Sequence, residues 1–484
     1  MTPTRLRILA FSGILIAIFL PHLTDFNYGF GSYEMIAFTA GAFVIGTLLG
    51  MICRIQIIFG FVLGYLIYVF VDSYFLEPRW AISCLLICYF LTPVLVRHIP
   101  NGFPLVVFVF GCVFGLPSFF APSDPFLVNR EAEVAVVSSD RAEVAYLHII
   151  LDEQLSPIVD HPTMPPVVGR EEVIETYLVH DFRLYGRADS VAQETYQAVS
   201  AIFGLSENDD NHIKQPEDNP YIYVVDDNQL VQRLLDSGFA PTIIGSNYLG
   251  LCSEDPRVTC RRYAMNDMMA GAELMGWRPF RRLQYAMIAL SNNYIWGSRL
   301  LIGYRGPAIL MSRLFGWQYQ PYESMMATVT NLSLLEGLPA TVAGLERGDA
   351  LIAHLLVPHR PFVLDRDCSF NDLPDWRYPL FRHTTQLDPS SYEAFWDQSI
   401  CTHRRLTDVL EAVEGRDDLI IIVHGDHGSR ILSKTEMNTH VDSRATLLAV
   451  RAPGIEHGLM SSTVSLQARF ADIIGYLLPA DQAN

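Results

Sequence analysis

Long apolar runs fill the first quarter of the chain and predict a bundle of membrane helices. Residues 9–20 are almost wholly apolar, and further runs cover residues 34–52, 55–71, 81–96 and 104–120. Each is close to the ~20 residues that a helix needs to cross the hydrocarbon of a bilayer. We therefore predict a transmembrane domain of about five helices over residues 1–120. The alternative is a signal peptide followed by buried core helices, but a signal peptide is one short apolar run.

After residue 144 the pattern changes to short apolar runs separated by stretches with helical spacing. Residues 121–144 are mixed and polar and are predicted to be a linker. The strand-like runs are Ala145–Leu151, Tyr221–Val225, Pro241–Gly245, Ala350–Leu356, Leu419–Val423 and Thr446–Val450. The helical patterns are Thr195–Phe203, Leu230–Leu235, Tyr392–Val413 and Ser465–Leu478. Strands that alternate with helices predict an α/β domain with a mainly parallel central sheet over residues 145–484.

Charges in the short loops of the apolar region predict its orientation. Arg5 and Arg7 precede the first run, Arg54 follows the second, and Arg97 and His98 follow the fourth, whereas the alternate loops carry mostly acidic residues. By the positive-inside rule the N-terminus and the second and fourth loops face the cytoplasm. An odd number of spans then places the α/β domain outside the cytoplasm.

The cysteines agree with an oxidising compartment. Four of the eight lie in the predicted soluble domain, at Cys252, Cys260, Cys368 and Cys401. Two disulfides between sequence neighbours, Cys252–Cys260 and Cys368–Cys401, are expected there, with four free buried thiols as the alternative. No CxxC spacing occurs, which argues against a structural zinc site.

Charge narrows the choice of partners. The formal net charge is −18, which argues against a general nucleic-acid-binding protein. From Arg257 to Arg313, however, nine arginines and several aromatic residues stand against two acidic residues. We predict a helical insertion around residues 257–345. It suits either a membrane interface with anionic headgroups or packing onto the acidic domain.

The strongest chemical motif is His424-Gly425-Asp426-His427-Gly428, directly after the strand-like run that ends at Val423. A carboxylate beside an imidazole at a strand end is a compact pair of ligands for a divalent metal. The alternative is a tight turn with an incidental Asp and His.

Other candidate groups also follow strand-like runs. Asp152-Glu153 comes after the run that ends at Leu151, and two adjacent acids there are costly unless they meet a cation. Thr195 starts a helical pattern, where a hydroxyl is commonly a cap but becomes a nucleophile if a metal lowers its pKa. The run Ala350–Leu356 leads into a second histidine-rich segment, His354–Pro361.

The order of these motifs resembles the alkaline phosphatase and sulfatase superfamily over nearly all of residues 145–478. With five membrane spans in front, the chain looks like the phosphoethanolamine transferases and lipoteichoic acid synthases. By that resemblance the metal ligands are Glu153, Thr195, Asp426 and His427, and Thr195 is the nucleophile. Asp152 matches the paired Asp of sulfatases and is a further candidate ligand.

Two histidines match substrate-binding positions of these enzymes. His359 matches the histidine of the transferases' Ser-His-x-Pro, with Pro358 in place of the Ser, and His440 is a looser match to a second substrate histidine. The segment after Thr195 lacks the Pro-Cys-Met of phosphoethanolamine transferases and the Gly-Lys-Thr of lipoteichoic acid synthases. The Cys/Ser-x-Pro-x-Arg signature that yields formylglycine is also absent, which disfavours a typical sulfate-ester hydrolase.

The resemblance implies a phosphotransferase with one divalent metal, zinc or manganese. It would move a headgroup, phosphoethanolamine or phosphoglycerol, from a membrane phospholipid to a glycan or lipid acceptor. The location implied is the bacterial cytoplasmic (inner) membrane, with the catalytic domain on the periplasmic or extracellular side. The alternatives are a membrane-bound phosphodiesterase or sulfatase-like hydrolase, and an inactive sulfatase-like scaffold or sensor.

Overall fold

In a computed structural model, the chain forms two compact units. Unit 1 comprises Met1–Pro125 and Asp267–Tyr322, and unit 2 comprises Phe126–Asn266 and Glu323–Asn484. The structure describes residues 3–25, 33–52, several positions between 59 and 67, 81–98, 102–119, 126–130, 141–159, 167–207, 213–214, 223–225, 228–246, 248–252, 255–263, 273–276, 278, 327–371, 389–429, 431 and 443–479.

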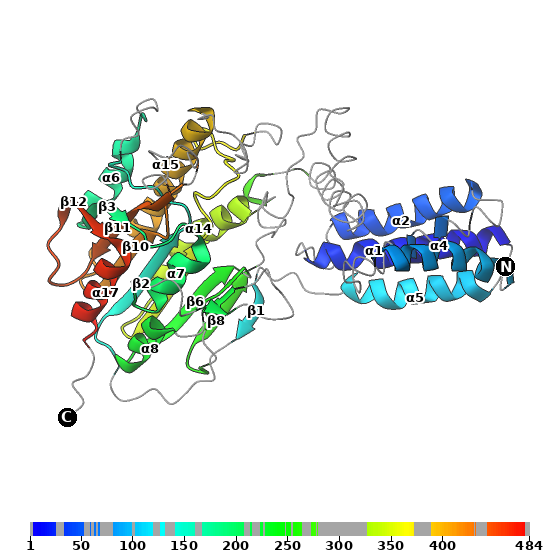
Figure 1. The fold of residues 1–484 in the computed structure, drawn as a ribbon, viewed down its shortest axis with the longest axis horizontal. Coiled ribbons are helices and arrows are strands. Elements are labelled where there is room, and N and C mark those ends of the chain that lie inside the picture. The colour runs from blue at the N-terminus through cyan, green and yellow to red at the C-terminus, as the bar shows by residue number, and fades with distance from the viewer. Residues whose placement is uncertain are drawn as a thin grey trace. The chain divides into compact units, whose positions relative to one another are not determined.

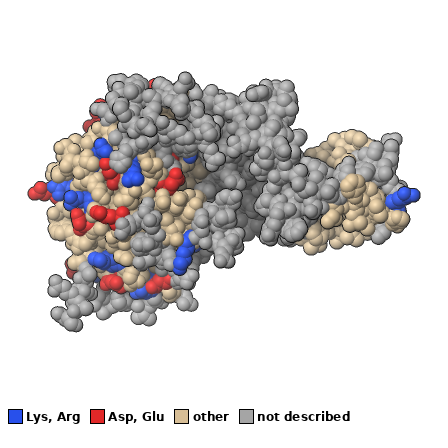
Figure 2. Space-filling view, viewed as in Figure 1, with Lys and Arg blue, Asp and Glu red and all other residues tan. Residues whose placement is uncertain are grey.

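Unit 1 is helical where it is described. Its helices are α1 (Pro3–Asp25), α2 (Tyr33–Ile52), α4 (Ala81–His98) and α5 (Gly102–Phe119), and they contain four of the five predicted apolar runs. Most of the predicted run 55–71 lies outside the described residues. In the view of Figure 2, the described part of this unit is almost free of charge, with basic side chains only at the N-terminal end.

Small residues let α1 and α2 approach closely. A Cβ atom added to Gly46 would lie 2.7 Å from the backbone nitrogen of Ser12, and one added to Gly50 would lie 2.9 Å from that of Ile8. Gly46 and Gly50 therefore form a G-x-x-x-G pair at the contact with α1. Such spacing is frequent where membrane helices pack, because their association depends on close van der Waals contact.

By length and hydropathy, the described residues contain one helix that could cross a membrane alone. It is Met35–Ile52 of α2, with a mean hydropathy of 2.1. The segments Phe90–His98 and Phe103–Phe110 pass the same test when they are taken together, but the chain bends by 118° between them. If this bent pair counts as one span, the described residues contain at most two candidate spans. The five-span bundle stays a prediction.

Unit 2 is built on a nine-stranded mixed sheet in the order β1-β8-β6-β9-β2-β10-β11-β3-β12 (Figure 1). Five of the eight strand pairings are parallel, including those that join β6, β9, β2 and β10 at the centre. The strands are β1 (Phe126–Arg130), β2 (Ala145–Leu151), β3 (Arg183–Asp189), β6 (Ala240–Ser246), β8 (Thr259–Tyr263), β9 (Asp349–Leu355), β10 (Leu419–Gly425), β11 (Ala445–Arg451) and β12 (Gly458–Ser465). The expected α/β architecture with a mainly parallel sheet is confirmed for this unit.

Helices cover both faces of the sheet. They are α6 (Arg170–Leu178), α7 (Thr195–Phe203), α8 (Gln229–Asp236), α14 (Ala327–Ala343), α15 (Pro389–Glu411) and α17 (Leu466–Leu477). Apolar side chains of α7, α8 and α17 pack in one core with Tyr146 and Ile150 of β2. Since every residue of β2 is buried and successive side chains point to opposite faces, the second face is covered too. The helices α6, α14 and α15 pack on one another in a second group.

Six strands were predicted, and each is found within about two residues at its ends. Ala145–Leu151 is strand β2 without any shift, and Tyr221–Val225 contains β5 (Tyr223–Val225) of a small second sheet with β4 (Ile213–Lys214) and β7 (Leu249–Gly250). The predicted linker 121–144 is not strand-free, because β1 lies in it and pairs with β8. The pattern also missed β3, β8 and β12.

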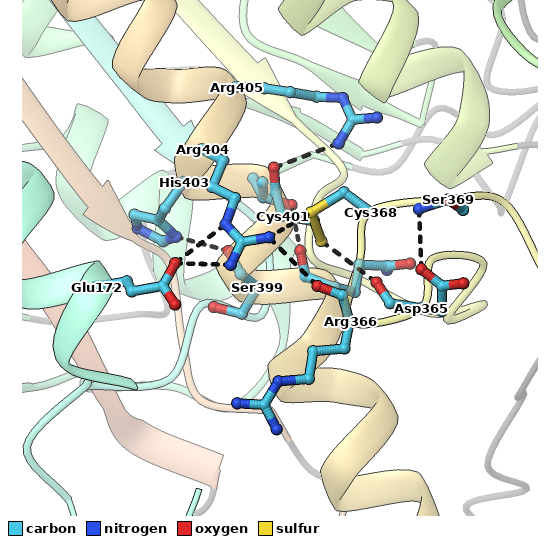
Figure 3. Close-up of a disulfide and its surroundings, with 12 residues drawn as sticks. Glu172, Asp365, Arg366, Cys368, Ser369, Ser399, Cys401, His403, Arg404 and Arg405 are labelled. Carbon is cyan, nitrogen blue, oxygen red and sulfur yellow. Dashed lines mark hydrogen bonds and ion pairs between the residues drawn. A yellow bond between two sulfur atoms is a disulfide. The ribbon is translucent and has the colours of Figure 1, made fainter. Parts of the chain in front are cut away.

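Both predicted disulfides are present in unit 2. Cys252 is bonded to Cys260 and Cys368 to Cys401. The second bond joins α15 to the chain that follows β9, and Arg404 of the same helix pairs with Glu172 beside it (Figure 3).

Candidate metal and nucleophile site

Two adjacent parallel strands bring the two acidic motifs together. Strands β2 and β10 pair in register, with Leu151 opposite Gly425, so Asp152 and Asp426 both follow at the same edge of the sheet. A Cβ atom on Gly425 would lie 2.7 Å from the carbonyl oxygen of Gln154. The close approach of the two chains therefore requires glycine at this position of the HGDHG motif.

A buried group of potential metal ligands lies at this edge. One ligand atom each of Asp152, Asp426 and His427 lies within 4.8 Å of the others, and all three residues are buried. The Nε2 atom of His427 lies 3.3 Å from Asp426 Oδ2 and 3.9 Å from Asp152 Oδ1. Asp426 uses its other oxygen, Oδ1, to accept hydrogen bonds from the backbone N–H groups of Glu153 and His427, at 3.0 and 2.8 Å.

The orientation of His427 leaves a lone pair facing the group. Its Nδ1 lies 2.7 Å from the carbonyl oxygen of Gly428, which can only accept, so Nδ1 carries the hydrogen. In the neutral ring Nε2 is then unprotonated. This is the tautomer that binds a metal, and it is fixed as in many metal sites by a backbone carbonyl.

The candidate nucleophile lies against the same group. Thr195 is the first residue of α7 and is buried. Its Oγ1 lies 3.2 Å from His427 Nε2 and 3.4 Å from both carboxylate oxygens of Asp152. Because a helix N-terminus carries partial positive charge, an oxyanion at Thr195 would be stabilised there.

The donor set fits a divalent cation. Two buried carboxylates, a hydroxyl and an imidazole lone pair are oxygen and nitrogen ligands that suit zinc or manganese. Asp426 Oδ2 is fully buried and has no hydrogen-bond partner among the described residues. A buried carboxylate without a partner is costly, and a cation between Asp152, Asp426 and His427 would satisfy it.

The two neighbouring acids divide between two sets of contacts. Asp152, and not Glu153, contributes to the ligand group. Glu153 has a left-handed backbone, with φ of 63°, and its Oε1 lies 3.7 Å from Nε2 of His359. That Glu153 is a metal ligand stays a prediction. Asp152, expected as a further candidate ligand, is the acid that lies with Asp426 and His427.

The ring of His359 faces Glu153 through its Nε2 atom. Its Nδ1 donates to the carbonyl oxygen of Arg360 at 2.6 Å, so Nε2 carries no hydrogen in the neutral ring. The side chain is 18% exposed, which makes it reachable from solvent. His440, the other predicted substrate histidine, lies outside the described residues.

One histidine at the site, the first of the segment His354–Pro361, received no role from the sequence. His354, on β9, is fully buried, and Nε2 lies 3.9 Å from Asp152 Oδ2. Neither ring nitrogen has a hydrogen-bond partner among the described residues. Burial lowers its pKa to about 4, so the ring is neutral near pH 7. Its position on a buried strand parallel to β2 was the available signal.

A pair of buried histidines lies on β2 and β10, before the acidic motifs. His148 of β2 and His424 of β10 are joined through their Nε2 atoms at 2.7 Å. His424 donates from Nδ1 to the carbonyl oxygen of Gly425 at 2.8 Å, so His148 is the donor between the two rings. Burial lowers the pKa of both, which keeps the pair neutral beneath Asp426.

No protein-family model and no curated protein matches the chain. Among solved structures it is similar to the phosphonate monoester hydrolase of Agrobacterium radiobacter, at 12% identity over 69% of this chain and 73% of that one, with a TM-score of 0.39. It is similar to the C-terminal periplasmic domain of EcEptC from Escherichia coli in complex with Zn, at 10% identity, 74% and 80% coverage and a TM-score of 0.36. For the lipoteichoic acid synthase LtaP from Listeria monocytogenes the values are 11%, 74%, 79% and 0.36.

Likeness at these identities does not carry the neighbours' activities to this chain. An acidic pair after β2, a threonine at the start of α7 and a Gly-Asp-His-Gly turn after β10 meet at one edge of a mainly parallel sheet. Unit 2 thus brings together the motifs whose order in the sequence resembles the alkaline phosphatase and sulfatase superfamily.

Proposed function

We propose that the protein is a metal-dependent membrane phosphotransferase that moves a phospholipid headgroup through a phospho-threonine intermediate at Thr195. The headgroup is phosphoethanolamine or phosphoglycerol, and the acceptor is a hydroxyl of a glycan or lipid. The observation that carries the proposal is the place of Thr195 Oγ1, within 3.4 Å of Asp152 and His427 at a helix N-terminus.

The first half-reaction forms a bond between Thr195 Oγ1 and the phosphorus of the donor lipid. The bond from phosphorus to the diacylglycerol oxygen breaks, and the proton lost by the Thr195 hydroxyl goes to that oxygen, so diacylglycerol leaves as the alcohol. In the second half-reaction the acceptor oxygen bonds to phosphorus, the bond to Thr195 Oγ1 breaks, and the acceptor's proton restores the Thr195 hydroxyl. His359 would hold the phosphate or transfer these protons, a role supported by its partly exposed side chain beside Glu153.

Asp152, Asp426 and His427 would hold the divalent metal, with Glu153 as the further predicted ligand. When bound, the metal supplies Lewis-acid chemistry that lowers the pKa of the threonine hydroxyl and offsets charge on the phosphate. The chain itself contributes a buried position for Thr195 and the N-terminus of α7 beside its oxyanion.

A membrane anchor supports a lipid donor in particular. Apolar side chains on α2 are open to the surroundings, among them Val44 and Ile52 at 59% and 75% exposure. A helix of this kind held in a bilayer keeps an attached site near headgroups and raises their effective concentration. We propose five spans, with unit 2 on the periplasmic or extracellular side of the inner membrane.

The test is the covalent intermediate. Full-length protein in detergent is incubated with phosphatidylethanolamine or phosphatidylglycerol that carries a labelled headgroup, and the intact mass and the label are followed. Wild type should gain a phosphoethanolamine or phosphoglycerol group on Thr195, and Thr195→Ala should gain none. Thr176→Ala is a matched control, because Thr176 is also helical and its hydroxyl donates within α6, to the carbonyl oxygen of Glu172.

Labelled adduct on Thr195→Ala would refute the proposed nucleophile. Addition of a glycan acceptor to the wild-type adduct then separates transfer from hydrolysis. Release of the group to water at the same rate with and without acceptor would identify a phosphodiesterase instead of a transferase.

A further inference from the structure

The segment that carries His359 is held by one buried amide side chain. Gln398, on α15, is fully buried. Its Nε2 lies 3.0 Å from the carbonyl oxygens of Pro358 and His359 and 3.3 Å from that of Pro361, and its Oε1 accepts from the N–H of Val363 at 2.7 Å. The three carbonyl groups can only accept, so they face the amide nitrogen of Gln398, and the N–H of Val363 can only donate, so it faces the amide oxygen. The amide group of Gln398 therefore has only one orientation.

The neighbouring residue of α15 contacts the opposite wall of the site. Ser399 donates from Oγ to Oε1 of Gln154 at 3.0 Å, and Gln154 directly follows Glu153. Two consecutive buried residues of one helix therefore hold the two segments that place His359 opposite Glu153. The His359 side is held through backbone carbonyl groups and the Glu153 side through the Gln154 side chain, and the two acid–base side chains lie 3.7 Å apart between them.

A second donor acts on the same carbonyl group. Thr328 of α14 donates from Oγ1 to the carbonyl oxygen of His359 at 2.8 Å. Farther along, the chain is tied to α15 again by the bond between Cys368 and Cys401, one helical turn from Gln398 (Figure 3). The segment is thus fixed at both ends to the same helix.

We propose that Gln398 is a positioning residue that sets His359 for the reaction, with Thr328 in a supporting role. The inference rests on the proposed function in that His359 is taken to contact the transferred phosphate. Without the Gln398 amide, three carbonyl groups lose a donor and the segment loses one of the contacts that fix it to α15. A displacement of about 1 Å at a catalytic group lowers rates by up to about a hundredfold.

The test is a double-mutant cycle in full-length protein with bis(4-nitrophenyl) phosphate as the ester. Gln398→Met keeps the shape of the side chain and removes its hydrogen bonds. It should lower kcat about tenfold or more in the wild-type background but less than about threefold when His359 is already alanine. A structural role alone would give the same fold-loss in both backgrounds.

Two further variants guard the result against misfolding. Thr402→Val removes an equally buried hydrogen bond one turn along α15, to the backbone of Gln398, and should leave kcat near that of wild type. Thr328→Val keeps Gln398 intact and should show the same dependence on His359 with a smaller loss. Equal fold-losses with and without His359, for both Gln398→Met and Thr328→Val, would overturn the proposal.

The signal of the His359 ring can be measured without any enzyme activity, and it tests the positioning role of Gln398 separately from the phosphotransferase proposal. In spectra of protein with 13Cε1-labelled histidine, the His359 signal, assigned with His359→Gln, should move in Gln398→Met and stay in Thr402→Val. If wild type cleaves no ester but this shift occurs, the positioning role stands and the phosphotransferase proposal fails. A His359 signal that is the same in wild type and Gln398→Met would overturn the positioning role.

Discussion

Replacement of Gly425 by alanine tests the close approach of the two segments that build the site. The added methyl group would lie 2.7 Å from the backbone oxygen of Gln154 and closer still to the hydroxyl of Thr446. That hydroxyl donates to the same oxygen at 2.7 Å, so the methyl group and the hydrogen bond compete for one place. A backbone oxygen cannot rotate away as a flexible side chain can, and the segment after β2 must move.

The loss of stability follows from two terms. Overpacking a well-packed site costs about 1–3 kcal/mol, and the broken hydrogen bond adds about 1 kcal/mol. A total of about 2–4 kcal/mol should lower the Tm of unit 2 by roughly 4–16 °C, at about 2–4 °C per kcal/mol. The assay is thermal unfolding of the full chain in detergent, followed by near-ultraviolet circular dichroism.

Gly475→Ala is the matched control. Gly475 lies within α17, and an added Cβ atom there meets nothing within 4 Å. Alanine should stabilise this helix by about 0.5–1 kcal/mol, because glycine loses more backbone freedom on folding. A Gly425→Ala protein that unfolds within 1–2 °C of wild type, roughly the scale of 0.5 kcal/mol, would show that the two segments do not approach as described.

Two further predictions concern metal and protons. Removal of bound metal with a chelator should lower the Tm, and return of zinc or manganese should restore it. At a hundredfold excess of metal over Kd, the gain in the free energy of unfolding is about 2.7 kcal/mol. The Tm of Asp426→Asn should change much less, and a change equal to that of wild type would argue against this site. The pKa of His403 is lowered to about 4, chiefly by burial, while its Nε2 accepts from Tyr177 and its Nδ1 donates to the Ser399 carbonyl. Since the unfolded ring binds a proton near pH 6.5, stability is full above that pH and falls as pH drops toward 4, by up to about 1.4 kcal/mol per unit. Urea unfolding between pH 4 and 8 should therefore show a shallower decline for His403→Gln, and an unchanged slope would refute this assignment.

The central strands could be predicted from the sequence because both of their faces are buried. Strands β2, β9 and β10 are continuous apolar runs, as expected where helices cover both sides of a parallel sheet. The strands that the pattern missed lie toward the edges. β3, with the sequence RLYGRAD, is only partly buried, and β12 at the sheet edge is mostly exposed. Their apolar content is too low for burial to appear as a pattern.

Residues that only position the site, such as Gln398, are harder to predict from the sequence than the motif residues. Thr195, Asp426 and His427 follow short apolar runs or start a helix, and they meet in the structure as the motif order suggested. Gln398 is a polar residue within an otherwise ordinary helical pattern, and nothing in its neighbours indicates four backbone partners. Such contacts depend on the register between α15 and a segment about 40 residues earlier, which local periodicity does not contain.

The two acids after β2 show how far a motif alone can assign roles. Asp152 is the first residue past the strand, and its carboxylate continues toward the HGDHG turn of the neighbouring strand. Glu153 takes a left-handed backbone conformation, which turns its side chain toward His359. Because the chain direction changes between adjacent residues, one acid meets the metal ligands and the other meets the histidine that Gln398 holds. Glu153 is therefore positioned to influence His359 directly, and its part in metal binding stays a prediction.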